Sequence, residues 1–445
     1  MSLFVLSGFF PSEFSPSRFM SQSHDTDVRM RGFSDRVTVE YALAWLDAEL
    51  EARIGSDAKV RSEEVALDRA AGRVLAEDHV AGLNVPGFAR AMMDGFAVRA
   101  SDIQGASAYN RLQLVEVGVS MPGRGFAGQT GPGQAVRIMT GAPLPEGVDA
   151  VLPAELVDWG VDGNSPCAIG EVSVGKHISQ PGEDIARGQT VFSSGRLLRP
   201  QDIGVLSSLG VAKVQVLCLP RVRIVITGNE LLAAGTPPAG YQITDANGPM
   251  LAALVARDGG LVRNPGIVPD QREAIRKALA DEAEIILISG GSSVGEEDHA
   301  PGLVLEMGKL PIHGIAMRPS SPTGIGTIGH KLIFLLPGNP VSCLCAYDFY
   351  AARAIRALGG MGREFPYRKV RMPLRRKLVS VVGRVDYARV ELVDGQVEPL
   401  AISGASMLST TTRADGFVIV PGNSEGWPAA AEVDVFLYDA EIIGS

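Results

Sequence analysis

The chain between residues 221 and 360 alternates short apolar runs with amphipathic helical patterns. VRIVIT and IILIS are continuous apolar runs, which are typical of strands buried on both faces. A helical pattern begins at Asp245 and stops at Gly259, and the spacing of Asp270 and Glu273 predicts a capping box for the next helix. This alternation predicts a doubly wound parallel sheet with helices on both faces, which binds ligands at the carboxyl ends of its strands.

The rest of the chain has different patterns. Helical periods occupy residues 37–54 and part of 63–81, and a helix of the same character recurs near residue 200. Between residues 85 and 179, frequent glycines and prolines separate short apolar strands, which is typical of an all-β module. Alternating segments after about residue 367 predict a small β domain. We therefore predict a disordered leader (1–34), a split elongated domain (35–84 and 180–218), an inserted β domain (85–179), an α/β domain (219–364) and a C-terminal β domain (365–445).

Composition narrows the class of protein. The 445 residues are 46% hydrophobic and 20% charged, as expected of an ordinary soluble protein with roughly three domains. The net charge of −9 argues against binding to nucleic acid or to an anionic membrane, because both need a broad basic field. Four cysteines are too few for a disulfide scaffold, so we expect them to be reduced core residues. No apolar run reaches the roughly 20 residues that span a bilayer, and we expect a cytoplasmic protein.

Three predicted strands of the α/β domain run into loops rich in glycine, proline and hydroxyl side chains. These loops are Thr227 to Glu230, Ser289 to Asp298 and Pro337 to Pro340. Each leads toward a helix start, so backbone N–H groups and the positive end of the helix dipole can face an anion. Asn339 has the N-cap position and Pro340 the first helical position of the last helix. Tight turns alone would explain one such loop equally well, but three together favour one phosphate site.

Four carboxylates adjoin these strand ends. Asp245 and Asp270 are expected to cap helices. Glu230 and Asp298 have no such local role. Carboxylates repel a phosphate unless a hard cation such as Mg²⁺ bridges the two, so Glu230 and Asp298 are candidate metal ligands.

Six motifs occur along the chain in a fixed order: PGFARAMMDGFAV, RIMTGAPLPEGVDAVLP, GEDIARGQ, ITGNEL, SGGSSVGEED and LPGNPVS. This set resembles the MoeA family, the molybdopterin molybdenumtransferases that include the gephyrin E domain. The resemblance covers about residue 37 to the C-terminus. It implies a multidomain α/β plus β fold: a split elongated domain, an inserted β domain, a molybdopterin-binding α/β domain and a C-terminal β barrel. It also implies a homodimer whose active cleft lies between the α/β domain of one subunit and the inserted domain of the other.

The resemblance further implies insertion of molybdate into adenylylated molybdopterin, with Mg²⁺-dependent release of AMP. Molybdoenzymes or other cofactor-assembly proteins are further candidate partners. The implied catalytic residues are Glu230, Asp298, Asp94 and Asp184, of which Glu230 and Asp298 would bind the metal. Arg389 and Ser406 would hold the oxyanion, although the strand pattern alone places Arg389 on a solvated face. The implied substrate-binding residues are Thr140, Thr227, Gly228, Asp245, Ser289, Gly290, Gly291, Ser292, Ser293, Gly295, Arg318, Pro337, Gly338, Asn339 and Pro340.

One segment departs from the family pattern. The family usually has K-x-x-x-K-P-G-K-P between the two glycine loops, whereas this chain reads GIAMRPSSP. Gly314, Arg318 and Ser321 replace the three lysines, so two positive charges are lost, and each loss could remove roughly 1.5–3 kcal/mol of anion binding. Two interpretations remain open: a working site that is differently tuned, and a non-catalytic paralogue that carries molybdopterin or the finished cofactor. The sequence also leaves open the choice between molybdate and tungstate.

Overall fold

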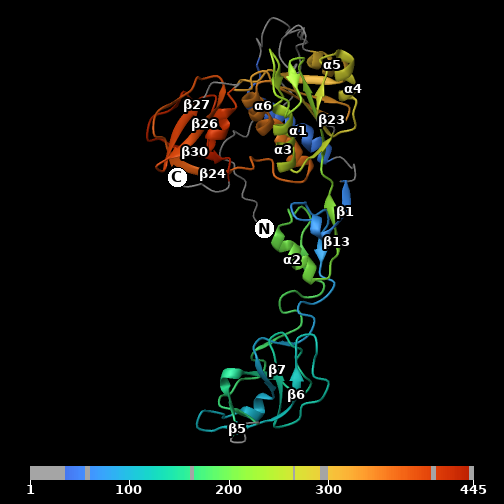
Figure 1. The fold of residues 1–445 in the computed structure, drawn as a ribbon, viewed down its shortest axis with the longest axis vertical. Helices are drawn as coiled ribbons and strands as arrows, with labels where there is room; N and C mark the ends of the chain where they lie inside the picture. Colours follow the sequence, from blue (N-terminus) through green and yellow to red (C-terminus); the bar gives the residue numbers. More distant parts are fainter. Residues whose placement is uncertain are drawn as a thin grey trace.

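The computed structural model of the protein describes residues 36–55, 61–160, 165–263, 266–290, 299–401 and 407–439. Figure 1 shows an elongated molecule with the α/β domain and the C-terminal domain side by side at one end. The split domain lies in the middle, and the inserted β domain occupies the opposite end. The predicted leader at residues 1–34 lies outside the described residues.

The α/β domain is built on one sheet of strand order β17-β14-β19-β23-β22-β20, with β18 also paired to β14. Strands β14, β17, β18, β19 and β23 are parallel, but β20 and β22 are antiparallel, so the sheet is mixed rather than wholly parallel as predicted. The strands are β14 (Arg221–Thr227), β17 (Leu261–Arg263), β18 (Ile267–Val268), β19 (Ile285–Ser289), β20 (Lys309–His313), β22 (Gly324–Ile328) and β23 (Lys331–Leu336), with a small pair β15 (Leu231–Leu232) and β16 (Ile243–Thr244) beside them. The helices are α3 (Asn247–Arg257), α4 (Arg272–Leu279), α5 (His299–Met307) and α6 (Pro340–Ala346), the last continuing through a π-helical turn, η5 (Tyr347–Ala351), into α7 (Ala352–Leu358).

Helices cover both faces of this sheet, because successive strand residues point into two different cores. On β19, Leu287 belongs to a core shared with α3, α6 and α7, whereas its neighbour Ile288 belongs to a core shared with α4 and α5. Helix α1 (Val39–Ile54) packs into the first of these cores, with Leu46 and Leu50 fully buried. We predicted that α1 belongs to the split domain, but its apolar face packs against the helices of the α/β domain.

The C-terminal domain is a second sheet of strand order β21-β26-β28-β30-β24, with β27 paired to β26 and a separate β25-β29 pair. Its elements are β24 (Arg368–Pro373), β25 (Leu378–Val379), β26 (Val385–Val393), β27 (Gln396–Ala401), α8 (Ser409–Arg413), β28 (Gly416–Val420), β29 (Gly426–Trp427) and β30 (Glu432–Leu437). Edge strand β21 (Met317–Arg318) comes from the α/β part of the chain and pairs in parallel with β26. The predicted barrel is therefore an open sheet in the described residues, because one of its edges pairs with the neighbouring domain instead of closing.

The split domain joins two stretches that are far apart in the sequence. Strands β1 and β13 pair antiparallel, as do β2 and β12. Its elements are β1 (Ser62–Ala66), the 3₁₀ turn η2 (Leu67–Arg69), β2 (His79–Val80), β12 (Thr190–Phe192), α2 (Pro200–Ser208) and β13 (Lys213–Leu217). The helix predicted within residues 63–81 is thus wrong, because pairing with β13 overrides the local helical pattern.

The inserted domain has the predicted all-β character. A four-stranded sheet of order β6-β7-β4-β8 packs beside a three-stranded sheet, β5-β10-β9, and a short pair, β3-β11. The elements are β3 (Arg90–Ala91), β4 (Gly95–Val98), η3 (Ala100–Ile103), β5 (Leu112–Gln113), β6 (Val115–Ser120), β7 (Gln134–Ile138), β8 (Ala150–Pro153), η4 (Ala154–Leu156), β9 (Val157–Trp159), β10 (Pro166–Ala168) and β11 (Ile178–Ser179).

Candidate functional site

The carboxyl ends of three neighbouring parallel strands bring the predicted loops together. Ile226 near the end of β14 is in register with Ser289 at the end of β19, and Ser289 is in register with Leu336 at the end of β23. The loops that follow therefore leave the same edge of the sheet, as the sequence predicted. At this edge the Ser289 hydroxyl donates to the Pro337 carbonyl at 3.4 Å.

Asn247 links these loops and was missed by sequence reasoning. It is the first residue of α3 and is 7% exposed. Its Nδ2 donates to Ser289 Oγ at 2.9 Å and to the Gly338 carbonyl at 2.7 Å. One amide thus ties the start of α3 to the loops after β19 and β23. The signal for it was its position two residues after Asp245, inside the predicted helix start.

Asp245 precedes Ala246, the N-cap residue of α3, and its Oδ1 accepts the Gly248 N–H at 2.9 Å, so its side chain caps the helix start as predicted, from one position earlier. A Cβ at Gly248 would lie 2.3 Å from Asp245 Oδ2, so a larger residue there would displace the Asp245 carboxylate. The predicted capping box of Asp270 and Glu273 is wrong. Helix α4 starts at Arg272 after Gln271, and the helix end has no side-chain cap.

Three polar atoms at this edge are buried without a hydrogen-bond partner in the described part of the chain. They are Thr227 Oγ1, Asn247 Oδ1 and Asp270 Oδ1. Thr227 ends β14, and Asp270 follows β18, which pairs with the end of β14. Buried polar atoms nearly always have partners, so a set of unpaired atoms at one sheet edge indicates a site for a polar ligand.

Gly290 sets how closely two of the loops approach. Its φ is +96°, and a Cβ there would lie 2.0 Å from the Thr227 carbonyl oxygen. Any other residue would push the loop after β19 away from the end of β14. Nearby, Gly228 leads into a turn that carries the exposed Glu230. The loop residues Gly291, Ser292, Ser293, Gly295 and Asp298, and also Ser406 near the C-terminus, lie outside the described residues.

The loop after β23 has the predicted helix start. Asn339 occupies the N-cap position and Pro340 the first position of α6. The Asn339 side chain makes no capping bond, and both Gly338 and Asn339 are exposed. Their polar groups therefore remain accessible to a ligand at the sheet edge.

Cys343 lies beneath the same edge, with Sγ 3.6 Å from Ser289 Oγ. Burial raises the pKa of its thiol to about 12, so the thiol stays protonated at neutral pH. Cys343, Cys345 and Cys167 are buried and Cys218 is partly buried, all as free thiols, which agrees with the predicted reduced cysteines.

Asp94 and Thr140 form a second, exposed pair in the inserted domain. The backbone N–H and the hydroxyl of Thr140 both donate to Asp94 Oδ1, each at 2.7 Å. The backbone bond, followed by the hydroxyl bond, lowers the pKa of Asp94. Asp184 is also exposed, and its N–H donates to the Val85 carbonyl. Because Figure 1 places the sheet of β6 and β7 at the far end of the molecule, one chain does not bring this pair to the α/β site.

The two predicted cations lie where the C-terminal domain meets the α/β domain. Arg389 on β26 is fully buried, so its assignment from pattern alone to a solvated face is wrong. Arg318 is partly exposed, and its Nη2 donates to the buried Asp386 Oδ2 at 2.7 Å. Arg318 therefore forms an ion pair with a carboxylate of the C-terminal domain.

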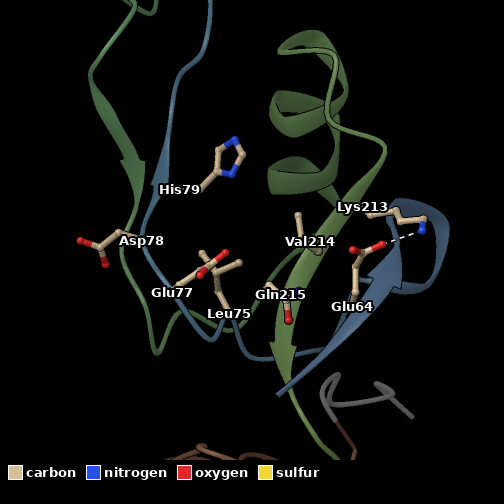
Figure 2. A pocket seen from close by; sticks show the side chains of 8 residues that line it. All are labelled: Glu64, Leu75, Glu77, Asp78, His79, Lys213, Val214 and Gln215. Atoms are coloured by element: carbon tan, nitrogen blue, oxygen red, sulfur yellow. Dashed lines mark ion pairs between the residues drawn. The ribbon is translucent and has the colours of Figure 1, made fainter. Parts of the chain in front are cut away.

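A pocket of about 300 Å³ lies elsewhere, in the split domain. Lys213 Nζ lies 2.6 Å from Glu64 Oε1. Figure 2 shows this ion pair on one side of the pocket and His79 on the other, with the Asp78 side chain turned away. None of the predicted site residues lines this pocket. The described residues contain no cluster of three or more acidic, histidine or cysteine side chains arranged for a metal, and no helix among them is long and apolar enough to cross a membrane.

Residues 37–210 match the MoeA N-terminal region (domain I and II), residues 223–357 the "Probable molybdopterin binding domain", and residues 371–438 the MoeA C-terminal region (domain IV). The "molybdopterin molybdenumtransferase 2" of Mycobacterium tuberculosis is 34% identical over 388 residues, which cover 84% of this chain and 94% of the relative. The chain belongs to the MoeA family. The family assignment from the ordered motifs is thus confirmed.

Other MoeA relatives agree in length and fold. The molybdopterin molybdenumtransferase of Haemophilus influenzae is 31% identical over 369 residues, covering 81% of this chain and 90% of that protein. A solved molybdopterin biosynthesis MoeA protein from Pyrococcus horikoshii has a TM-score of 0.76 at 31% identity, covering 92% of this chain and all of that one. The α/β plus β MoeA fold extends over most of the chain.

Proposed function

We propose that this MoeA protein is a molybdopterin molybdenumtransferase, which inserts molybdate into adenylylated molybdopterin and releases AMP. The observation that carries the proposal is the edge of the sheet where Asn247 ties two loops together beside three unpartnered polar atoms. A pterin nucleotide has amino groups, ring N–H groups and phosphates, which such a mixed set of donors and acceptors can bind. The MoeA relatives named as transferases support the same reaction.

The proposed roles follow the sequence prediction, extended by two residues. The pterin nucleotide would be bound by Thr227, Gly228, Asp245, Ser289, Gly290, Gly291, Ser292, Ser293, Gly295, Pro337, Gly338, Asn339 and Pro340, together with Asn247 and Asp270. Arg389 and Ser406 would hold the oxyanion. Glu230 and Asp298 would hold Mg²⁺, which would offset the phosphate charge. Of this pair, Glu230 is among the described residues and is exposed in the turn after β14.

We further propose that the protein acts as a homodimer in the cytoplasm. Asp94, Thr140 and Asp184 would face the α/β site of a second copy, since the elongated chain holds them far from its own α/β domain. Molybdoenzymes or other cofactor-assembly proteins would receive the product. Arg318 would not bind the substrate directly, because its guanidinium is bonded to the Asp386 carboxylate.

The reaction is tested by incubating purified protein with adenylylated molybdopterin and Mg²⁺, with molybdate, with tungstate or with neither. We expect AMP release that depends on the oxyanion, and background release in every arm would refute the proposal. Gly290→Ala should abolish the release, because the new Cβ meets the Thr227 carbonyl. Gly188→Ala is the matched control, since Gly188 has a similar φ of +86° but open space around it.

A further inference from the structure

The segment that lacks the family lysines is bound to three other parts of the molecule. The Ala316 N–H donates at 2.8 Å to the carbonyl of Val37, just before α1, and the Val385 N–H donates at 2.9 Å to the Ala316 carbonyl. Ser320 Oγ donates to the Ser342 carbonyl of α6 at 2.5 Å. The segment is therefore held between the N-terminal helix, the helix behind the sheet edge and the C-terminal domain.

Asp386 is the anchor of this arrangement on the C-terminal side. It is fully buried and lies opposite Arg318 in the parallel pairing of β21 with β26. Its Oδ2 accepts from Arg318 Nη2 and from Ser380 Oγ, each at 2.7 Å, and its Oδ1 accepts from Arg384 Nε at 3.1 Å. A buried carboxylate with two guanidinium partners and a hydroxyl is well satisfied, and removing one partner leaves charge that solvent does not compensate.

We propose that Arg318 is a positioning residue, which holds Asp386 and thereby fixes β26, with the buried Arg389, against the α/β domain. The inference rests on the proposed function, because Arg389 is the proposed oxyanion ligand. Asp386 and Arg389 lie on one strand, three residues apart and both fully buried, so a shift of the strand moves both. Arg318, which stands where the family usually has a lysine, would thus act on Arg389 through Asp386.

A direct role for Arg318 as a charged oxyanion ligand makes the opposite predictions. Asp386→Asn would free Arg318 and add one positive charge, which should lower the KM for molybdate if Arg318 binds the anion itself. If Arg318 acts through Asp386, the same change should raise that KM. Arg318→Lys distinguishes the two roles as well, because lysine keeps the charge but loses the planar fork that matches a carboxylate.

The experiment measures kcat and the separate KM values for molybdate and adenylylated molybdopterin. For Asp386→Asn and Arg318→Lys we expect a KM for molybdate raised about tenfold or more, the effect of losing one charge-assisted hydrogen bond, and an unchanged KM for the pterin nucleotide. Arg375→Lys, at an exposed ion pair of the same domain, is the control and should change neither. A lowered or unchanged KM for molybdate in either variant would overturn the proposal.

A second measurement separates this inference from the proposed function. Hydrogen exchange of the Val385 amide reports the pairing of β21 with β26 without any turnover. It should accelerate in Arg318→Lys and not in Arg375→Lys. Unchanged exchange would overturn the positioning role even in an active enzyme, whereas a wild-type protein without oxyanion-dependent AMP release would refute only the reaction.

Discussion

The α/β domain and the inserted β domain hold their predicted site residues in opposite ways. In the α/β domain, Asn247 is buried and bonded to two loops, and Thr227 is 2% exposed. In the inserted domain, Asp94 and Thr140 are exposed and bonded to each other. Internal hydrogen bonds thus fix the loops of the α/β site within the chain. In the inserted domain, hydrogen bonds from Thr140 orient the exposed carboxylate of Asp94 at the surface.

The two regions also differ in whether their hydrophobic core is shared with another domain. One core runs from α1 through the α/β helices into the C-terminal domain, where it includes Tyr387 and Phe417. The inserted domain has its own cores, with Phe96 in one of them. The α/β and C-terminal domains should therefore unfold together and the inserted domain by itself.

The largest expected effect is a loss of stability in the α/β and C-terminal domains that leaves the inserted domain unchanged. Phe417 is fully buried and stacks on Tyr387 with ring centroids 4.2 Å apart. Phe417→Ala should destabilise the α/β and C-terminal domains by about 3–5 kcal/mol, the usual cost of such a truncation. Differential scanning calorimetry should show one transition lowered, with the transition of the inserted domain unchanged.

Phe96→Ala provides the matched control in the inserted domain, where Phe96 is 5% exposed. It should lower the other transition alone. If both variants shift the same transition, the two regions share one cooperative unit and the comparison fails.

A smaller effect is expected where the α/β site is preformed. Asn247→Ala removes two hydrogen bonds, one to the Ser289 hydroxyl at the end of β19 and one to the Gly338 carbonyl after β23, at a cost of about 1–3 kcal/mol. Because the loops are then less fixed, the KM for adenylylated molybdopterin should rise about tenfold. Steady-state kinetics and urea unfolding would measure the two effects. Asn110→Ala is the control: it removes an exposed hydrogen bond from the Asn110 amide to the Gly105 carbonyl, and it should change neither the KM nor the stability. An unchanged KM in Asn247→Ala would show that Asn247 is not part of the binding site.

Local features of the α/β site were predictable from the sequence. The continuous apolar runs define strands, and the Asp245 cap and the Asn339-Pro340 helix start depend on residues within one turn. The Asp270 and Glu273 spacing matched a capping box, but helix α4 begins without it. Sequence spacing alone does not show whether a carboxylate turns toward its helix or toward a ligand.

Features set by distant parts of the chain were not predictable from pattern. The burial of Arg389 depends on how β26 packs against the α/β domain, and the Arg318–Asp386 contact joins residues of two domains. The family resemblance identified Arg389 as a residue that would hold the oxyanion, whereas the alternating strand pattern predicted that its side chain is exposed to solvent. Burial of a charged residue is decided by the partners it meets in the folded chain.

Within the exposed pair, the expected change is in activity and not in stability. Asp94→Asn keeps an oxygen that can accept from Thr140 but removes the negative charge. We expect oxyanion-dependent AMP release to fall at least about tenfold, as is typical for loss of a catalytic carboxylate, with thermal unfolding unchanged. Asp102→Asn is the control, since Asp102 also accepts a backbone N–H in the inserted domain, from Gly133. Equal activities of the two variants would show that Asp94 has no special role.

A pH-dependent effect is expected in the core that α1, the α/β domain and the C-terminal domain share. Asp348 in η5 is buried and accepts hydrogen bonds from Tyr367 at 3.0 Å and from Arg257 at 3.1 Å. Burial raises the pKa of Asp348 from 3.8 to about 6, although Arg257 acts in the opposite direction. The folded chain therefore holds a proton that the unfolded chain has released between about pH 4 and pH 6.

Stability should thus fall as the pH rises through that window, by at most about 1.4 kcal/mol per pH unit, and the contribution is lost above it. Asp348→Asn cannot ionise, so the variant should lose this part of the slope while the inserted domain keeps its own pH dependence. Urea midpoints measured across the window would show the difference, with the 82% exposed Glu273 changed to Gln as the control. A variant that retains the wild-type slope would mean that Asp348 stays ionised in the folded core, in which case Arg257 and Tyr367 outweigh its burial.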